Sequence, residues 1–113
     1  MKEEIAVRML GALAHGSRLA ALRLLIKAGP AGRAAGEIAA ALNVAPTTLS
    51  FHLKELAHAG LVGSRQDGRS VIYSARFAQI AALMAFLTED CCGGAPCGLP
   101  AVFEPLRRVT APA

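Results

Sequence analysis

The chain has 113 residues, 54% of them hydrophobic but only 4% aromatic, which fits one small domain of closely packed helices rather than a sheet sandwich. Its net charge of +4 is compatible with a polyanionic partner. Because no apolar run reaches the ~18 residues that a membrane helix needs and no secretory pattern opens the chain, we expect a cytoplasmic protein with no membrane partner.

Apolar residues recur at helical spacing through the first half of the chain and predict four helices. These helices are expected over residues 3–14, 17–28, 35–42 and 46–59. A tight turn at residues 43–45 separates the third helix from the fourth. Pro46 then suits the first position of the fourth helix, and Gly60 ends it.

After Gly60 the pattern changes to two short strands, at residues 61–65 and 70–74. The pair Asp67-Gly68 between them is typical of a hairpin turn. A fifth helix is expected over residues 75–87. Its predicted buried residues are Phe77, Ile80, Leu83, Met84 and Leu87. The predicted fold class is therefore mainly α with a small β-hairpin.

Two helices joined by a short turn and followed by a hairpin describe a winged helix-turn-helix. On the wheel of the fourth helix, Leu49, Leu53 and Leu56 share an inward face, and His52 lies at its edge as a structural residue. The residues that we expect to contact DNA are Thr47, Thr48, Ser50, Phe51, Lys54, Arg65 and Arg69. Hydroxyls and a phenyl ring on the first turns can reach base edges, whereas lysine and arginine favour phosphate.

Three segments carry a resemblance to a known family. Residues 12–19 look like the start of the second helix in the ArsR/SmtB family of metal-responsive repressors. Residues 47–62 are similar to that family's recognition helix and its exit, and residues 65–73 resemble its wing. The likeness covers about residues 3–90. It implies a homodimer, paired through the first and fifth helices, that represses an operon by binding double-stranded operator DNA.

The chain departs from the family pattern at two places. His15 and Gly16 stand where an Asp-Pro cap is usual, which should weaken a helix cap, and Phe51 stands where a polar residue is common. The expected organisation is a DNA-binding and dimerisation domain over residues 1–90 and an irregular cysteine-containing tail over residues 91–113.

The chain's three cysteines, Cys91, Cys92 and Cys97, lie close together in this tail. Thiolates select soft ions, and structural zinc usually takes four ligands, whereas three sulfurs satisfy trivalent arsenic or antimony. Adjacent cysteines on a continuing helix point ~100° apart, so they can converge only if the helix ends near them. We therefore expect these cysteines to bind As(III) or Sb(III) as an inducer that releases the operator, with no organic cofactor.

Other inducer sites and other classes of protein are alternatives to arsenic binding by these cysteines. Residues 33–37 contain no cysteine and residues 75–87 contain no His, Asp or Glu, so the arsenic and zinc sites that the resemblance implies there are absent. A sensor of cadmium, lead or zinc, a thiol-redox or persulfide sensor, an architectural DNA binder and a tail with no specific role remain open. An enzyme is not expected, because no arginine lies between Cys91 and Val102 to build an oxyanion loop.

Overall fold

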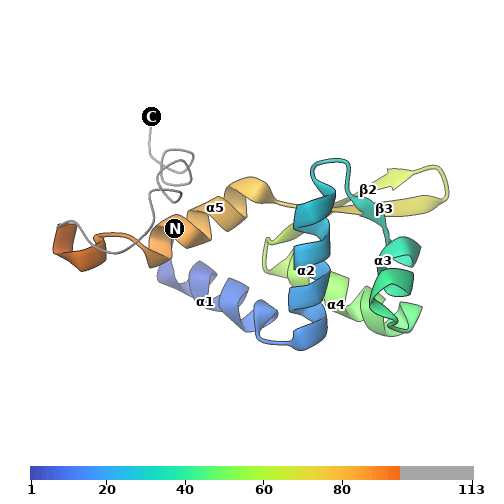
Figure 1. The fold of residues 1–113 in the computed structure, drawn as a ribbon, viewed down its shortest axis with the longest axis horizontal. Coiled ribbons are helices and arrows are strands. Elements are labelled where there is room, and N and C mark those ends of the chain that lie inside the picture. Colours follow the sequence, from blue (N-terminus) through green and yellow to red (C-terminus); the bar gives the residue numbers. More distant parts are fainter. Residues whose placement is uncertain (95–113) are drawn as a thin grey trace.

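A computed structural model describes residues 1–94, which form five α-helices and a three-stranded antiparallel sheet. The helices are α1 (Glu3–Leu13), α2 (Gly16–Ala28), α3 (Ala35–Leu42), α4 (Pro46–His58) and α5 (Phe77–Leu87). The strands are β1 (Arg33–Ala34), β2 (Val62–Asp67) and β3 (Ser70–Ala75), and a short 3-10 turn, η1 (Cys91–Gly94), follows α5. In Figure 1, α1 and α5 lie beside each other at one end, while α2, α3, α4 and the sheet occupy the other.

The four predicted N-terminal helices and the hairpin are confirmed, whereas the extent of the sheet and the start of the fifth helix differ from the prediction. The sheet has a third strand, β1, which pairs with β3 so that Arg33 faces Tyr73 and Ala34 faces Ile72. A strand of two residues is too short to show an alternating pattern in the sequence. The fifth helix begins at Phe77 rather than at Ala75, because Ala75 still pairs with Val62 across the hairpin.

Gly32 explains how β1 approaches the sheet. Its backbone lies in the left-handed region at φ +73°, and a Cβ at this position would collide with the carbonyl oxygen of Tyr73. Only glycine combines this conformation with so close a contact between two backbone segments. The link between α2 and α3 is thereby fixed against β3, the strand that forms one side of the wing.

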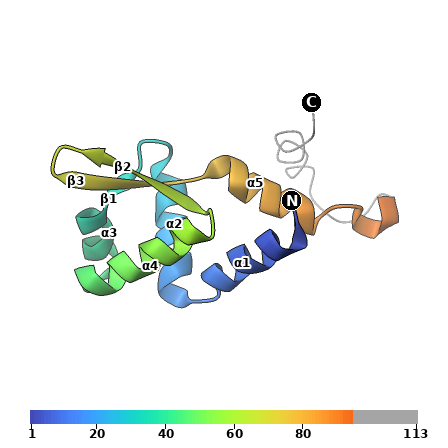
Figure 2. The same ribbon diagram turned by 180° about the vertical axis from the view of Figure 1, so that it is seen from behind.

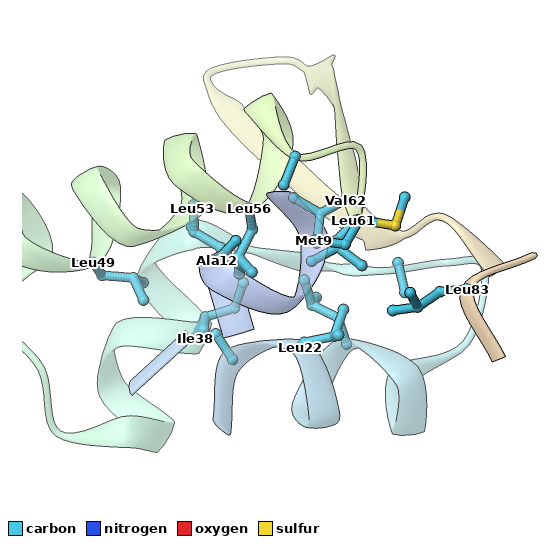
Figure 3. Close-up of a cluster of buried hydrophobic side chains, with 14 of the residues drawn as sticks. Met9, Ala12, Leu22, Ile38, Leu49, Leu53, Leu56, Leu61, Val62 and Leu83 are labelled. Carbon is cyan, nitrogen blue, oxygen red and sulfur yellow. The ribbon is translucent and has the colours of Figure 1, made fainter. Parts of the chain in front are cut away.

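The core lies between the inward face of α4 and the three helices before it. Leu53 and Leu56 of α4 point toward Ala12 of α1 and Ile38 of α3, with Leu22 of α2 close by (Figure 3). The predicted inward face of α4 is confirmed, since its leucines are at most 1% exposed. Burial of such side chains stabilises the fold by about 2 kcal/mol each.

Helix α5 buries a narrower face than the sequence suggested. Leu83 packs beside Met9 in the core and is 5% exposed (Figure 3). The prediction that α5 buries Phe77 and Leu87 is wrong for the single chain, because these side chains are 40% and 57% exposed. Helix α5 packs against α1, and Phe77 and Leu87 remain at the surface.

No single helix within residues 1–94 is long and apolar enough to cross a membrane. Taken together, α1 and α2 have the length and apolar composition of a membrane span, but the chain bends by 102° at the break between them.

Candidate nucleic-acid interface

The turn between α3 and α4 sets the orientation of α4, the candidate recognition helix. Asn43 ends α3 in the left-handed conformation, at φ 53°, and the N–H of Val44 donates to the carbonyl of Ala39 at 3.0 Å. Asparagine tolerates this conformation better than most residues. Pro46 then opens the recognition helix at its first turn, where no backbone donor is needed. The predicted tight turn is confirmed.

The outward face of the recognition helix carries the predicted reading residues. Thr47, Thr48, Phe51 and Lys54 are exposed and Ser50 is half-buried. Within residues 1–94, the side chains of these residues make no hydrogen bond and no ion pair. Their polar groups are therefore available to a partner, and the N-terminal turns of such a helix are the part that enters a major groove.

The wing is the hairpin of β2 and β3, and its tip is a loop of Gly68 and Arg69. Gly68 adopts φ +61°, and Gln66 Nε2 donates to its carbonyl at 2.9 Å. Arg69 is exposed at this tip, as a phosphate-contacting residue would be. Arg65 is exposed too, but its Nη2 donates to the carbonyl of Ala31 at 2.8 Å. Arg65 thus also fastens the wing to the loop before β1.

A cluster that the sequence did not reveal joins α2 to the recognition helix. Arg18 of α2 donates from Nε to Nδ1 of His52 at 3.2 Å, and its guanidinium carbon lies 5.5 Å from the ring centre of Phe51. The rings of His15 and His52 lie 4.5 Å apart. The cluster joins residues far apart in sequence, so no local spacing pointed to it.

His52 is 6% exposed, which confirms its predicted structural role. Burial lowers the pKa of its imidazole, and the nearby His15 and Arg18 lower it further. A neutral ring can accept a hydrogen bond at Nδ1, as the Arg18 contact requires. The expectation of a weak cap on α2 needs correction, because Nδ1 of His15 accepts a hydrogen bond from the backbone N–H of Ser17 at 3.2 Å.

The cysteines follow the end of α5. The helix stops at Leu87, and Cys92 adopts the left-handed conformation at φ 56°. This break brings Cys91 Sγ and Cys92 Sγ to 3.7 Å, so the predicted convergence of these two sulfurs, the thiol pair, is observed. Cys97 lies outside the described residues. Within residues 1–94, no group of three or more His, Cys, Asp or Glu side chains could hold a metal ion.

Comparison with known proteins gives consistent matches. A helix-turn-helix domain profile matches residues 13–65, which include α3 and the recognition helix. The uncharacterized HTH-type transcriptional regulator YceK of Bacillus subtilis is 36% identical over 74 residues, which are 66% of this chain and 73% of YceK.

Two solved structures align with a larger share of the chain. The homodimeric winged helix-turn-helix domain Mb0332 of Mycobacterium bovis, a possible ArsR-family regulator, aligns with a TM-score of 0.61 at 29% identity, covering 85% of this chain and 89% of that one. An ArsR-like transcriptional regulator from Rhodococcus sp. RHA1 aligns with a TM-score of 0.68 at 27% identity, covering 80% of this chain and 82% of that one.

Proposed function

The chain belongs to the ArsR/SmtB-type family of winged-helix transcriptional regulators, and from this premise we propose that it is a homodimeric repressor whose operator is released by trivalent arsenic or antimony. One observation carries the proposal. The outward side chains of the recognition helix are accessible and make no hydrogen bond within residues 1–94, and Arg69 is exposed at the tip of the neighbouring wing. The relatives named above are transcriptional regulators, which are not enzymes.

The operator contacts divide by chemistry. Thr47, Ser50 and Phe51 lie on the first turns of the recognition helix, where hydroxyls can bond base edges and a phenyl ring can touch a thymine methyl. Lys54 and Arg69 hold phosphates and fix the register on the duplex. A two-fold dimer of such units prefers an inverted repeat with half-sites ~10 bp apart. Mb0332, a homodimer, supports this assembly.

The thiol pair supports the inducer part of the proposal. Two thiolates can bind one soft ion only when their sulfurs lie within about 4 Å of each other. Cys91 Sγ and Cys92 Sγ are 3.7 Å apart, which is compatible with binding to one ion, whereas a disulfide would need about 2.05 Å. A third sulfur from Cys97 would complete the pyramid that trivalent arsenic requires.

Helix α5 connects the thiol pair to the DNA-binding unit. It begins directly after β3 of the wing, where the N–H of Arg76 donates to the carbonyl of Leu61 at 2.9 Å, and it packs against α1. Drawing three sulfurs around one ion changes the end of this helix, and the change can pass to the wing and to the dimer contact. The coupling must be reciprocal: inducer and operator weaken each other's affinity by the same factor, about 5–150-fold for 1–3 kcal/mol.

The experiment is operator release, measured by fluorescence anisotropy on reduced protein with an operator chosen by selection from random DNA. Arsenite, antimonite, cadmium and zinc are compared. We expect arsenite and antimonite to release the wild type, and Cys91→Ser and Cys92→Ser to bind the operator normally but without a response. Cys97→Ser should respond more weakly than the wild type. Glu89→Gln, an exposed neighbour of the thiol pair, is the matched control and should respond fully.

The outcome separates the alternatives. X-ray absorption of the arsenite complex should show three sulfur neighbours. Release by cadmium or zinc alone would favour a divalent-ion sensor, and release by polysulfide with loss of free thiols would favour a redox sensor. If the triple serine variant still leaves the operator when arsenite is added, the inducer binds elsewhere and this part of the proposal is wrong.

A further inference from the structure

We propose that Arg18, which lies on α2 and not on the recognition helix, positions the ring of Phe51 and thereby helps to select the operator sequence. The inference rests on the proposed operator binding. It adds a residue from a neighbouring helix to a reading surface that otherwise consists of the recognition helix and the wing.

The geometry holds the guanidinium of Arg18 at two points. Its Nε donates to Nδ1 of His52 at 3.2 Å, and its central carbon lies 5.5 Å from the centre of the Phe51 ring. A guanidinium is planar, so the hydrogen bond at Nε restricts how the group can lie over the Phe51 ring. His52 is itself buried, and its ring lies 4.5 Å from the tilted ring of His15, so its position is restricted by packing.

Phe51 needs such a support because its ring is 55% exposed on the face that we assign to the DNA. An exposed aromatic side chain on a helix can rotate, and a contact with a thymine methyl is favourable only in some orientations. The cation–π attraction at an exposed site changes the population of one orientation by roughly two- to fivefold. Arg18 therefore biases the ring before DNA arrives.

Within residues 1–94, the side chain of Arg18 makes one hydrogen bond, to His52, and no ion pair. Arg18 also lines a hollow of about 250 Å³ together with Arg8, Glu55 and His58. The guanidinium thus has room to leave Phe51 if the His52 contact is lost. Lysine would keep the charge but cannot reproduce the planar group that bridges the imidazole and the phenyl ring.

The test must separate positioning from charge, because any arginine near DNA also attracts phosphate without regard to sequence. We define discrimination as the ratio of dissociation constants between a substituted operator and the selected one. The substituted base pair is the one whose recognition is most sensitive to Phe51→Ala. Arg23→Ala is the matched control, since Arg23 is an exposed arginine on the same helix and makes no described contact with the recognition helix.

We expect Arg18→Ala to lower discrimination by about two- to tenfold. Arg18→Lys should recover affinity for all sequences but not discrimination, and Arg23→Ala should leave discrimination unchanged. In a double-mutant cycle, Arg18→Ala should have no further effect on discrimination once Phe51 is alanine. This dependence on Phe51 is the readout that a purely structural role would not produce.

Two results would overturn the inference. One is that Arg18→Ala weakens binding to all sequences by the same factor; the other is that its effect on discrimination is equal with and without the Phe51 ring. Urea unfolding shows whether each variant is folded. If Arg18→Ala does not fold, Arg18→Lys is compared with the wild type instead. A wild-type protein that selects no sequence at all would overturn operator binding itself, and that failure is visible before any variant is made.

Discussion

His52 is a titratable residue placed in the core at the back of the recognition helix. Its ring is 6% exposed and accepts a hydrogen bond from Arg18. Burial, with smaller contributions from His15 and Arg18, lowers its pKa below the usual 6.5. The folded state therefore prefers the neutral ring, whereas the ring of the unfolded chain binds a proton once the pH falls below that usual value.

This difference predicts how stability depends on pH. Because the unfolded state binds more protons in this range, the contribution of His52 is fully present above about pH 6.5 and is lost as the pH falls toward the lowered pKa. Urea unfolding at pH 8 and at pH 5 should show a larger loss for the wild type than for His52→Gln. His58→Gln, which changes an exposed histidine of the same helix, should behave like the wild type. Equal losses in wild type and His52→Gln would contradict this assignment.

The two wing arginines have different surroundings, and this difference can be measured at the scale of the hairpin. Arg69 is exposed at the tip with no described partner, whereas Arg65 donates to the carbonyl of Ala31. We therefore expect Arg69 to affect DNA binding and not the position of the wing. Arg65 contributes to the position of the whole wing as well.

We expect Arg69→Ala to reduce the slope of log affinity against log salt by about 0.9, as one lost phosphate contact would, and to weaken binding to all sequences about equally. The free energy of unfolding should not change. Arg65→Ala should lower that free energy by about 1 kcal/mol, because a hydrogen bond is lost. Salt titrations of operator binding and urea unfolding measure the two effects. Identical behaviour of both variants would show that the Ala31 contact does not hold the wing.

The elements that depend on local sequence could be predicted. Leucine spacing and Pro46 give the recognition helix, and the Asp67-Gly68 pair gives the wing, as the structure confirms. The strand β1 could not be predicted, because it exists only through its pairing with β3. The burial of α5 was predicted too broadly for a similar reason: an apolar stripe does not tell whether its partner is the same chain or another one.

The candidate site divides in the same way. The exposure of Thr47, Phe51 and Lys54 follows from the helical wheel, which the sequence contains. The contact of Arg18 with His52 joins positions 34 residues apart and depends on the angle at which α2 crosses the recognition helix. No spacing rule gives that angle. The roles of single residues at helix crossings therefore cannot be predicted from the sequence.

For the whole molecule, α1 and α5 form one end of the fold (Figure 1), and both helices carry exposed apolar side chains. This end lies away from the α3 side of the recognition helix and from the wing (Figures 1 and 2). The exposed members are Ile5, Val7, Leu10, Phe77 and Leu87. Exposed apolar side chains on two adjacent helices are typical of an interaction surface, and a second copy of the chain would cover them. Leu83 is not part of this surface, because it is buried in the core.

The dimer can therefore be tested without disturbing the protomer's core. Leu10 and Leu87 are 43% and 57% exposed, so a charge at either position would be buried only in the dimer. We expect Leu10→Glu and Leu87→Glu to sediment as monomers at micromolar concentration, where the wild type is a dimer. Operator affinity should fall by roughly 10²-fold or more, since each half-site must then bind alone. Val71→Glu, an exposed apolar residue of β3 in the wing, should remain dimeric. A wild type that sediments as a monomer would refute the paired assembly and, with it, the preference for inverted repeats.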